Sequence, residues 1–152
     1  MARYLYERSV DVFGGDLSAG MVERARDLNP GIEFRQGNML SLEAADEAWG
    51  AIVAFYSIIH IPRSDVPHAL REMRRVLRPG GLLFLAFHEG DHIVHLDQWW
   101  GHEVSLDFVF FGREEMEDYL TAAGFTVEES ITREPYPEVE HPSRRVYIVS
   151  QR

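Results

Sequence analysis

The sequence has no cysteine among its 152 residues. This absence excludes disulfide bonds, zinc sites built from thiolates and cysteine nucleophiles. The sequence also lacks an apolar run of about 18 residues, which a membrane-spanning helix requires, and its opening residues lack the apolar core of a signal peptide. We therefore expect a cytoplasmic protein with no membrane segment.

Basic residues are also scarce. The chain has 15 of them against 25 acidic residues, and its formal net charge is −10. This balance disfavours nucleic acid as a partner, because a phosphate backbone attracts basic surfaces. One local cluster of basic residues departs from this acidic balance, and it consists of Arg71, Arg74, Arg75 and Arg78. We interpret this cluster as the solvated face of a helix. With 45% apolar residues the chain can bury one core, so we predict a single domain over residues 1–152.

The apolar residues alternate between strand-like and helix-like patterns, which predicts an α/β fold. Near-continuous apolar runs at residues 51–56 and 81–87 are typical of parallel strands covered on both faces. Between them, apolar residues at helical spacing predict a helix from Ser64 to the turn at Pro79-Gly80-Gly81. The other predicted strands are residues 10–13, 32–35, 106–111, 125–131 and 145–150, and the other predicted helices are residues 18–28 and 113–123. A Pro- and Glu-rich connection joins the last two strands, which favours an antiparallel hairpin.

Residues 88–105 interrupt this alternation with a segment rich in His, Asp, Gly and Trp, which we interpret as a lid or binding loop. Within it, His88-Glu89-Gly90-Asp91-His92 matches the His-Glu-x-x-His pattern of zinc peptidases. That chemistry needs both histidines on one face of a helix, and Gly90 opposes a helix, so we predict no metal. A metal-dependent hydrolase that uses the His88–His95 loop stays open as an alternative. Trp99 and Trp100 are candidates for a pocket wall or for lid packing.

Polar or small residues follow four of the predicted strands: Asp16, Gly37-Asn38, Ser57 to His60, and His88-Glu89. In an open parallel sheet, ligands bind outside the carboxyl ends of the strands. Such folds place an acid that accepts hydrogen bonds from ribose hydroxyls at the tip of the second strand, and Asp16 fits this position. A turn or capping role for Asp16 is the alternative.

Several motifs occur in an order that is typical of one family. They are Asp16-Leu17-Ser18, Gly37-Asn38-Met39, Tyr56-Ser57-Ile58-Ile59-His60, Arg75-Val76-Leu77-Arg78-Pro79-Gly80-Gly81 and Ala122-Ala123-Gly124-Phe125. With them, the chain resembles the class I S-adenosylmethionine-dependent methyltransferases of the small-molecule type over residues 5–150. The resemblance implies a Rossmann-like α/β sheet, mostly parallel, with a C-terminal antiparallel hairpin.

The resemblance also implies S-adenosylmethionine as the cofactor and assigns residues to it. Asp16 is then the acceptor for the ribose hydroxyls, and Leu17 is a wall of the adenine pocket. Asn38 contacts the adenine, and Met39 packs on the base. The residues that line the methionine end of the cofactor are Phe55, Tyr56 and Ser57.

Methyl transfer is a one-step displacement, so the protein contributes mainly proximity, alignment and in some cases a base. His60, His88 and Glu89 are our candidates for positioning or deprotonating a small-molecule acceptor. An imidazole suits this role because its ordinary pKa lies near 6.5.

One feature of the family, a glycine-rich turn near the N-terminus, is missing from this sequence. No Gly-x-Gly-x-Gly turn precedes Val10, and residues 2–8 resemble only the tail of the helix that follows such a turn. We therefore predict that the first strand is missing, that the domain is N-terminally abbreviated and that cofactor binding is impaired. We expect either that the Val10 strand pairs with the Ala51 strand or that a homodimer pairs or swaps elements across the gap. A non-catalytic remnant or oligomerising module stays open as the alternative function.

Overall fold

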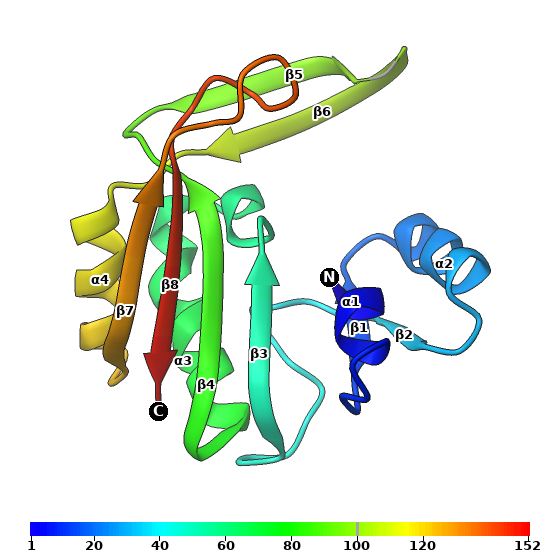
Figure 1. The fold of residues 1–152 in the computed structure, drawn as a ribbon, viewed down its shortest axis with the longest axis vertical. Helices are drawn as coiled ribbons and strands as arrows, with labels where there is room; N and C mark the ends of the chain where they lie inside the picture. Colours follow the sequence, from blue (N-terminus) through cyan, green and yellow to red (C-terminus); the bar gives the residue numbers. More distant parts are fainter. Residues whose placement is uncertain (100) are drawn as a thin grey trace. The chain divides into compact units, whose positions relative to one another are not determined.

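The computed structural model describes residues 1–99 and 101–152, which form two compact units, residues 1–44 and 45–152. Each unit has its own sheet, and a separate two-stranded sheet belongs to the larger unit (Figure 1). Within the described residues, no helix has both the length and the apolar character to cross a membrane.

The smaller unit consists of α1 (Ala2–Tyr6), β1 (Phe13–Asp16), α2 (Ala19–Leu28) and β2 (Glu33–Gln36). β1 and β2 pair in parallel, from Phe13 opposite Glu33 to Asp16 opposite Gln36. Ser18 caps α2, because its side chain accepts a hydrogen bond from the Met21 N–H at 3.3 Å.

The first strand lies further along the chain than predicted. The sequence favoured residues 10–13, but β1 runs through Gly14 and Gly15, and Val10 is exposed. The aromatic ring of Phe34 explains the glycine at position 14, since a Cβ there would lie 2.4 Å from the ring. Gly14 therefore permits close approach of β1 to β2.

The larger unit is built on a four-stranded sheet in the order β3-β4-β8-β7. Its strands are β3 (Trp49–Phe55), β4 (Leu77–His88), β7 (Thr126–Arg133) and β8 (Arg145–Gln151). β3 and β4 are parallel, whereas β8 is antiparallel to both β4 and β7. The predicted C-terminal antiparallel hairpin is therefore confirmed, and the sheet is mixed.

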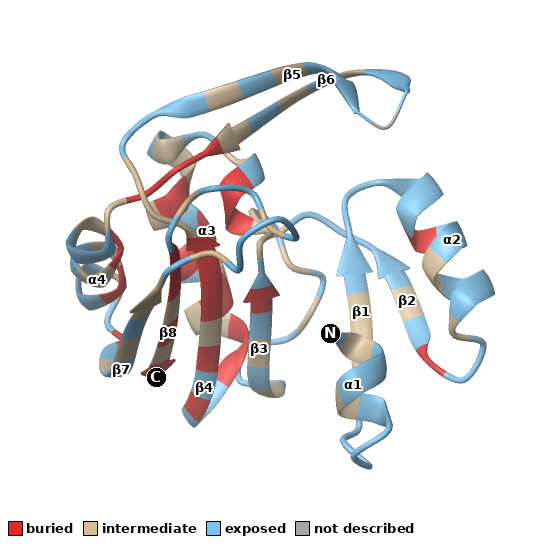
Figure 2. Ribbon diagram, turned by 45° about the horizontal axis from the view of Figure 1, so that its top comes forward, coloured by how far each residue is buried: buried red, intermediate tan, exposed pale blue. Residues whose placement is uncertain are grey.

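Helices α3 (Val66–Val76) and α4 (Arg113–Ala122) lie behind this sheet in Figure 1 and cover one of its faces. The core is formed between them and the sheet, where Leu70, Met73, Leu83, Leu85 and Ile148 are almost completely buried. Figure 2 shows these buried positions along α3, β4 and β8. Gly124 follows α4 with a φ of +87°, a backbone conformation that glycine adopts readily just after the end of a helix.

Two expectations about the sheet are wrong. The predicted loop at residues 88–105 contains most of an antiparallel hairpin, formed by β5 (Ile93–Trp99) and β6 (His102–Val109). Of the two alternatives for the gap, pairing of the Val10 strand with the Ala51 strand is not found, since among the described strands β1 pairs with β2, and β3 pairs with β4. Two short 3-10 helices, η1 (Ile58–His60) and η2 (Arg63–Asp65), connect β3 to α3.

Candidate functional site

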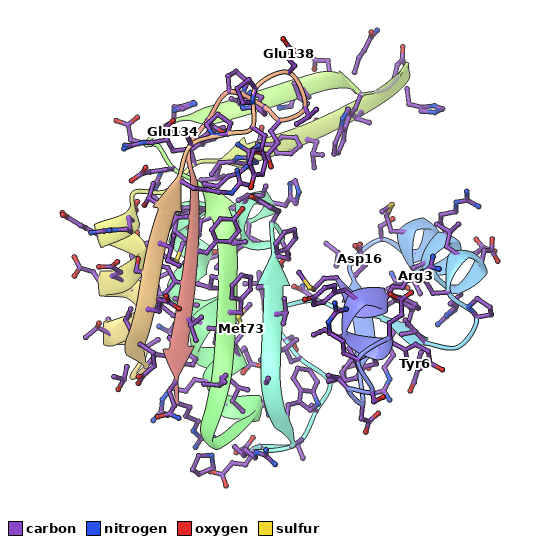
Figure 3. The ribbon with its side chains drawn as sticks, in the orientation of Figure 1. Arg3, Tyr6, Asp16, Met73, Glu134 and Glu138 are labelled. Atoms are coloured by element: carbon purple, nitrogen blue, oxygen red, sulfur yellow. The ribbon has the colours of Figure 1, made fainter. Side chains whose placement is uncertain are left out.

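The smaller unit presents Asp16 at the carboxyl end of β1 (Figure 3). Its Oδ1 atom accepts a hydrogen bond from the Ser18 N–H at 2.8 Å, which holds the carboxylate at the start of α2. Next to it, the Leu17 side chain is 67% exposed, and Met21 on α2 is also exposed. An oriented carboxylate beside uncovered apolar side chains fits a ribose and the flat face of a base, so these residues suit a nucleoside cofactor.

The neighbouring strand tip is tied to Asp16 by its backbone. The Gly37 N–H donates to the Asp16 carbonyl oxygen at 2.9 Å, and Asn38 follows directly. The Asn38 Oδ1 atom accepts from the Leu40 N–H at 2.9 Å, which makes a local turn. Because an amide oxygen can accept two hydrogen bonds, Asn38 keeps an acceptor and two donors for an adenine edge. Asn38 is exposed, and Met39 is partly exposed beside it.

In the larger unit, Tyr56 directly follows β3 and has a strained conformation. Its φ is +54°, which a side chain other than glycine rarely adopts. Its N–H donates to the Ala86 carbonyl oxygen at 2.9 Å, and its hydroxyl lies 3.3 Å from the Tyr147 hydroxyl. Burial raises the pKa of Tyr56, and the hydrogen bond with Tyr147 raises it further. Phe55 is 42% exposed, and Ser57 is partly exposed at the start of η1.

His88 lies at the end of β4, close to Tyr56. The two ring centroids are 5.0 Å apart, and the Phe110 ring stacks on His88 at 5.3 Å. The His88 Nδ1 atom is 2.9 Å from the Ser143 hydroxyl oxygen. Burial, followed by the positive charge of Arg145, lowers the pKa of His88 to about 4. His88 is therefore neutral at pH 7, with one ring nitrogen engaged by Ser143.

The other two predicted catalytic residues have different partners. Glu89 forms an ion pair with Arg144, with 2.9 Å between Oε2 and Nε. The His60 Nδ1 atom is 3.2 Å from the Asp107 carbonyl oxygen, and the His60 ring packs edge-on against Phe108 in β6. The structure thus brings His88 and Tyr56 together, while His60 contacts the β5–β6 hairpin.

The zinc-peptidase pattern lacks the helix that it needs, because His88 is the last residue of β4 and residues 89–92 have no helical structure. Among the described residues, no cluster of three or more His, Asp or Glu side chains is arranged to hold a metal ion. Trp99 packs edge-on against Phe108 at 5.5 Å between ring centroids, which supports packing within the hairpin. Trp100 lies outside the described residues.

Several residues around His88 were not selected from the sequence as site residues. They come from the connection between β7 and β8, which an internal ion-pair network orders. Both terminal nitrogens of Arg133 donate to the Glu140 carboxylate at 2.8 Å, and these hydrogen bonds lower the pKa of Glu140 to about 2. Arg145 is 4% exposed and donates to the Ser143 carbonyl oxygen at 2.6 Å. The Pro- and Glu-rich composition of this connection is visible in the sequence, whereas the burial of Arg145 and its contacts are seen only in the structure.

The chain is thus an α/β protein with polar side chains at the carboxyl ends of parallel strands, the place where folds of the nucleotide-cofactor class bind ligands. The chain belongs to the methyltransferase domain family, whose sequence pattern it matches over residues 1–81. The predicted class I methyltransferase fold is confirmed by this match and by the solved structures below, and S-adenosylmethionine is the cofactor of this class.

Two curated relatives illustrate the sequence similarity. The chain is 38% identical to methyltransferase GfsG of Streptomyces halstedii over 81 residues, which is 49% of this chain and 28% of GfsG. It is 31% identical to a demethylmenaquinone methyltransferase of Renibacterium salmoninarum over 80 residues, which is 53% of this chain and 33% of that protein. The matched segment therefore spans about a third of each relative.

Solved structures show the fold over the whole chain. An S-adenosylmethionine-dependent methyltransferase from Methanosarcina mazei superimposes with a TM-score of 0.88 at 17% identity, covering 100% of this chain and 86% of that one. The 1,6-didemethyltoxoflavin-N1-methyltransferase of Burkholderia thailandensis, solved with S-adenosylhomocysteine, gives a TM-score of 0.74 at 16% identity. It covers 99% of this chain and 64% of the Burkholderia protein.

Proposed function

We propose that this chain binds S-adenosylmethionine and transfers its methyl group to a small-molecule acceptor. The observation that carries the proposal is the Asp16 carboxylate, held by the Ser18 N–H at the end of a parallel strand beside the exposed Leu17. The names of the relatives support a small acceptor, since they refer to demethylmenaquinone and 1,6-didemethyltoxoflavin. When bound, the cofactor supplies an electrophilic methyl group.

The smaller unit holds the nucleoside part of the cofactor in this proposal. Asp16 accepts hydrogen bonds from the ribose hydroxyls, Leu17 and Met39 cover the faces of the base, and Asn38 reads its polar edge. A carboxylate acceptor is favourable here because hydrogen bonds to a charged group contribute about 1.5–3 kcal/mol each. In the larger unit, the resemblance assigns the methionine part to Phe55, Tyr56 and Ser57, and we keep these residues as candidates for that role.

His88 positions the acceptor in this proposal. With Nδ1 engaged by Ser143, the Nε2 atom is left to bind an acceptor hydroxyl or amine. An imidazole with a pKa of about 4 is a weak base, so orientation contributes more than deprotonation. His60 and Glu89 act as positioning residues, through the β5–β6 hairpin and through Arg144 respectively.

We also propose that two copies associate in solution through strand edges. Among the strands of residues 1–99 and 101–152, the hydrogen-bonded ladders pair β1 with β2 alone and β3 with β4 alone. Strand edges of this kind are the surfaces by which sheets join between chains.

The proposed function is tested by calorimetric titration of S-adenosylmethionine and S-adenosylhomocysteine into the wild-type chain and into Asp16→Ala. We expect saturable binding by the wild type and an affinity about 10- to 100-fold weaker in the variant, because a charge-assisted hydrogen bond is lost. Asp27→Ala on α2 is the matched control, since it removes a carboxylate from the same unit, and it should bind as the wild type does. A wild type that gives no binding heat at millimolar cofactor contradicts the proposal and supports the non-catalytic alternative.

A further inference from the structure

The larger unit contains a cavity of about 380 Å³ at the end of the sheet away from His88 and Tyr56. Asp46 and Glu47, which precede β3, line it together with Arg152, which follows β8. The Gly80 N–H donates to the Arg152 carbonyl oxygen at 3.0 Å, which places Arg152 beside the turn that leads into the paired part of β4. The cavity thus lies at the edge of the sheet where the parallel strands β3 and β4 begin. It is distinct from the proposed methyl-transfer site.

Four arginines line this cavity, and two of them are committed to carboxylates. Arg75 donates to Glu72 at 3.0 Å and to Asp46 at 2.8 Å. Arg152 donates to Glu47 at 2.8 Å and also to the carbonyl oxygen of Leu77. These contacts hold the inner guanidinium groups in place and neutralise the two acidic residues of the lining.

The other two arginines, Arg71 and Arg74, keep donors for a ligand. The Arg74 Nε donates to the Gly124 carbonyl oxygen at 3.1 Å, which orients the guanidinium and leaves both terminal nitrogens available. Among the residues that the structure describes, no carboxylate pairs with Arg71 or Arg74. The two side chains lie three residues apart on α3, so they project from the same face of the helix.

The cavity is therefore a cationic site on a chain whose formal net charge is −10. A guanidinium group offers a planar fork of donors that matches the oxygens of a phosphate group. The volume lies within the range of about 300–1,000 Å³ that is typical of small-ligand pockets. We propose that this cavity is an anion site that binds a phosphate group, free or as a monoester. Arg71 and Arg74 donate the hydrogen bonds that hold the phosphate oxygens. This site is independent of the proposed methyl transfer.

The test is a titration of the full chain with inorganic phosphate at constant ionic strength, followed by amide NMR shifts. We expect saturable binding, with the largest shifts in α3 and around Gly124. Arg71→Ala should weaken binding at least tenfold without disturbing the fold, because Arg71 is exposed. The double variant Arg71→Ala/Arg74→Ala should abolish binding. Arg78→Ala is the matched control, since Arg78 belongs to the same arginine run but does not line the cavity.

A response that never saturates, or an affinity that is equal in the wild type and Arg71→Ala, overturns the proposal. A parallel titration with glycerol phosphate distinguishes the two sources of the ligand. Tighter binding of the monoester identifies the site as one for a phosphorylated molecule, whereas equal binding identifies it as one for free phosphate. Cofactor binding in Arg71→Ala reports separately on the proposed methyltransferase function and should equal that of the wild type.

Discussion

Lowering the pH should destabilise the larger unit through a single imidazole, that of His88. Its ring lies between Tyr56 and Phe110, with centroid distances of 5.0 and 5.3 Å, and its Nδ1 atom is bound by Ser143. Burial lowers its pKa from an ordinary 6.5 to about 4, and the charge of Arg145 adds to this effect. Protonation of His88 therefore opposes the folded state.

The sign and size of the effect follow from the two pKa values. Between pH 6.5 and about 4, His88 binds a proton in the unfolded chain but not in the folded one. The stability that depends on neutral His88 is thus fully present above pH 6.5 and is lost as the pH falls toward 4. One pKa unit corresponds to about 1.4 kcal/mol. Because the ring is only half-buried, we discount the full shift and expect a loss of about 2 kcal/mol.

The assay is urea unfolding at pH 7 and at pH 4.5, together with an NMR titration of the His88 ring. His88→Gln cannot titrate, so it should lose about 2 kcal/mol less than the wild type over this interval. His68→Gln is the control, since it removes an exposed imidazole that lies on α3, away from the rings of Tyr56 and Phe110 that surround His88. The Glu140 carboxylate stays charged at both pH values because its pKa is about 2. Its ion pairs therefore contribute equally to the stability at pH 7 and at pH 4.5. An imidazole that titrates near 6.5, or equal losses in His88→Gln and the wild type, would refute the reasoning.

Two further predictions concern packing and association. Leu83 and Leu82 are neighbours on β4 that point to opposite faces, with exposed fractions of 0% and 43%. Leu83→Ala should lower the free energy of unfolding by about 3 kcal/mol and Leu82→Ala by less than about 1 kcal/mol, and equal losses in urea unfolding would contradict the burial pattern. If two copies associate through strand edges, light scattering should give twice the mass of 17.5 kDa, and a mass of one chain at all concentrations excludes the dimer.

The sequence alone determined the elements that depend on local chemistry. The cap at Ser18 and the positive φ at Gly124 follow from the side chain, or its absence, at one position. The burial of Leu70, Met73 and Val76 on α3 follows from helical spacing. The order of the motifs was enough to identify the methyltransferase fold, because that order reflects the order of the strand tips along the chain.

The tertiary structure decided the rest. Both strands of the β5–β6 hairpin alternate half-buried and exposed residues, but the His, Asp, Gly and Trp content of residues 88–105 favoured a loop, and the backbone pairing of the two strands reveals the hairpin. β1 has a glycine at position 14 because the Phe34 ring of β2 occupies the space that a Cβ would need there. Ser143 binds His88 across 55 residues of sequence, and the low pKa of His88 comes from burial and from charges that only the fold brings near. Contacts of this kind depend on distances in space, and one sequence records only distances along the chain.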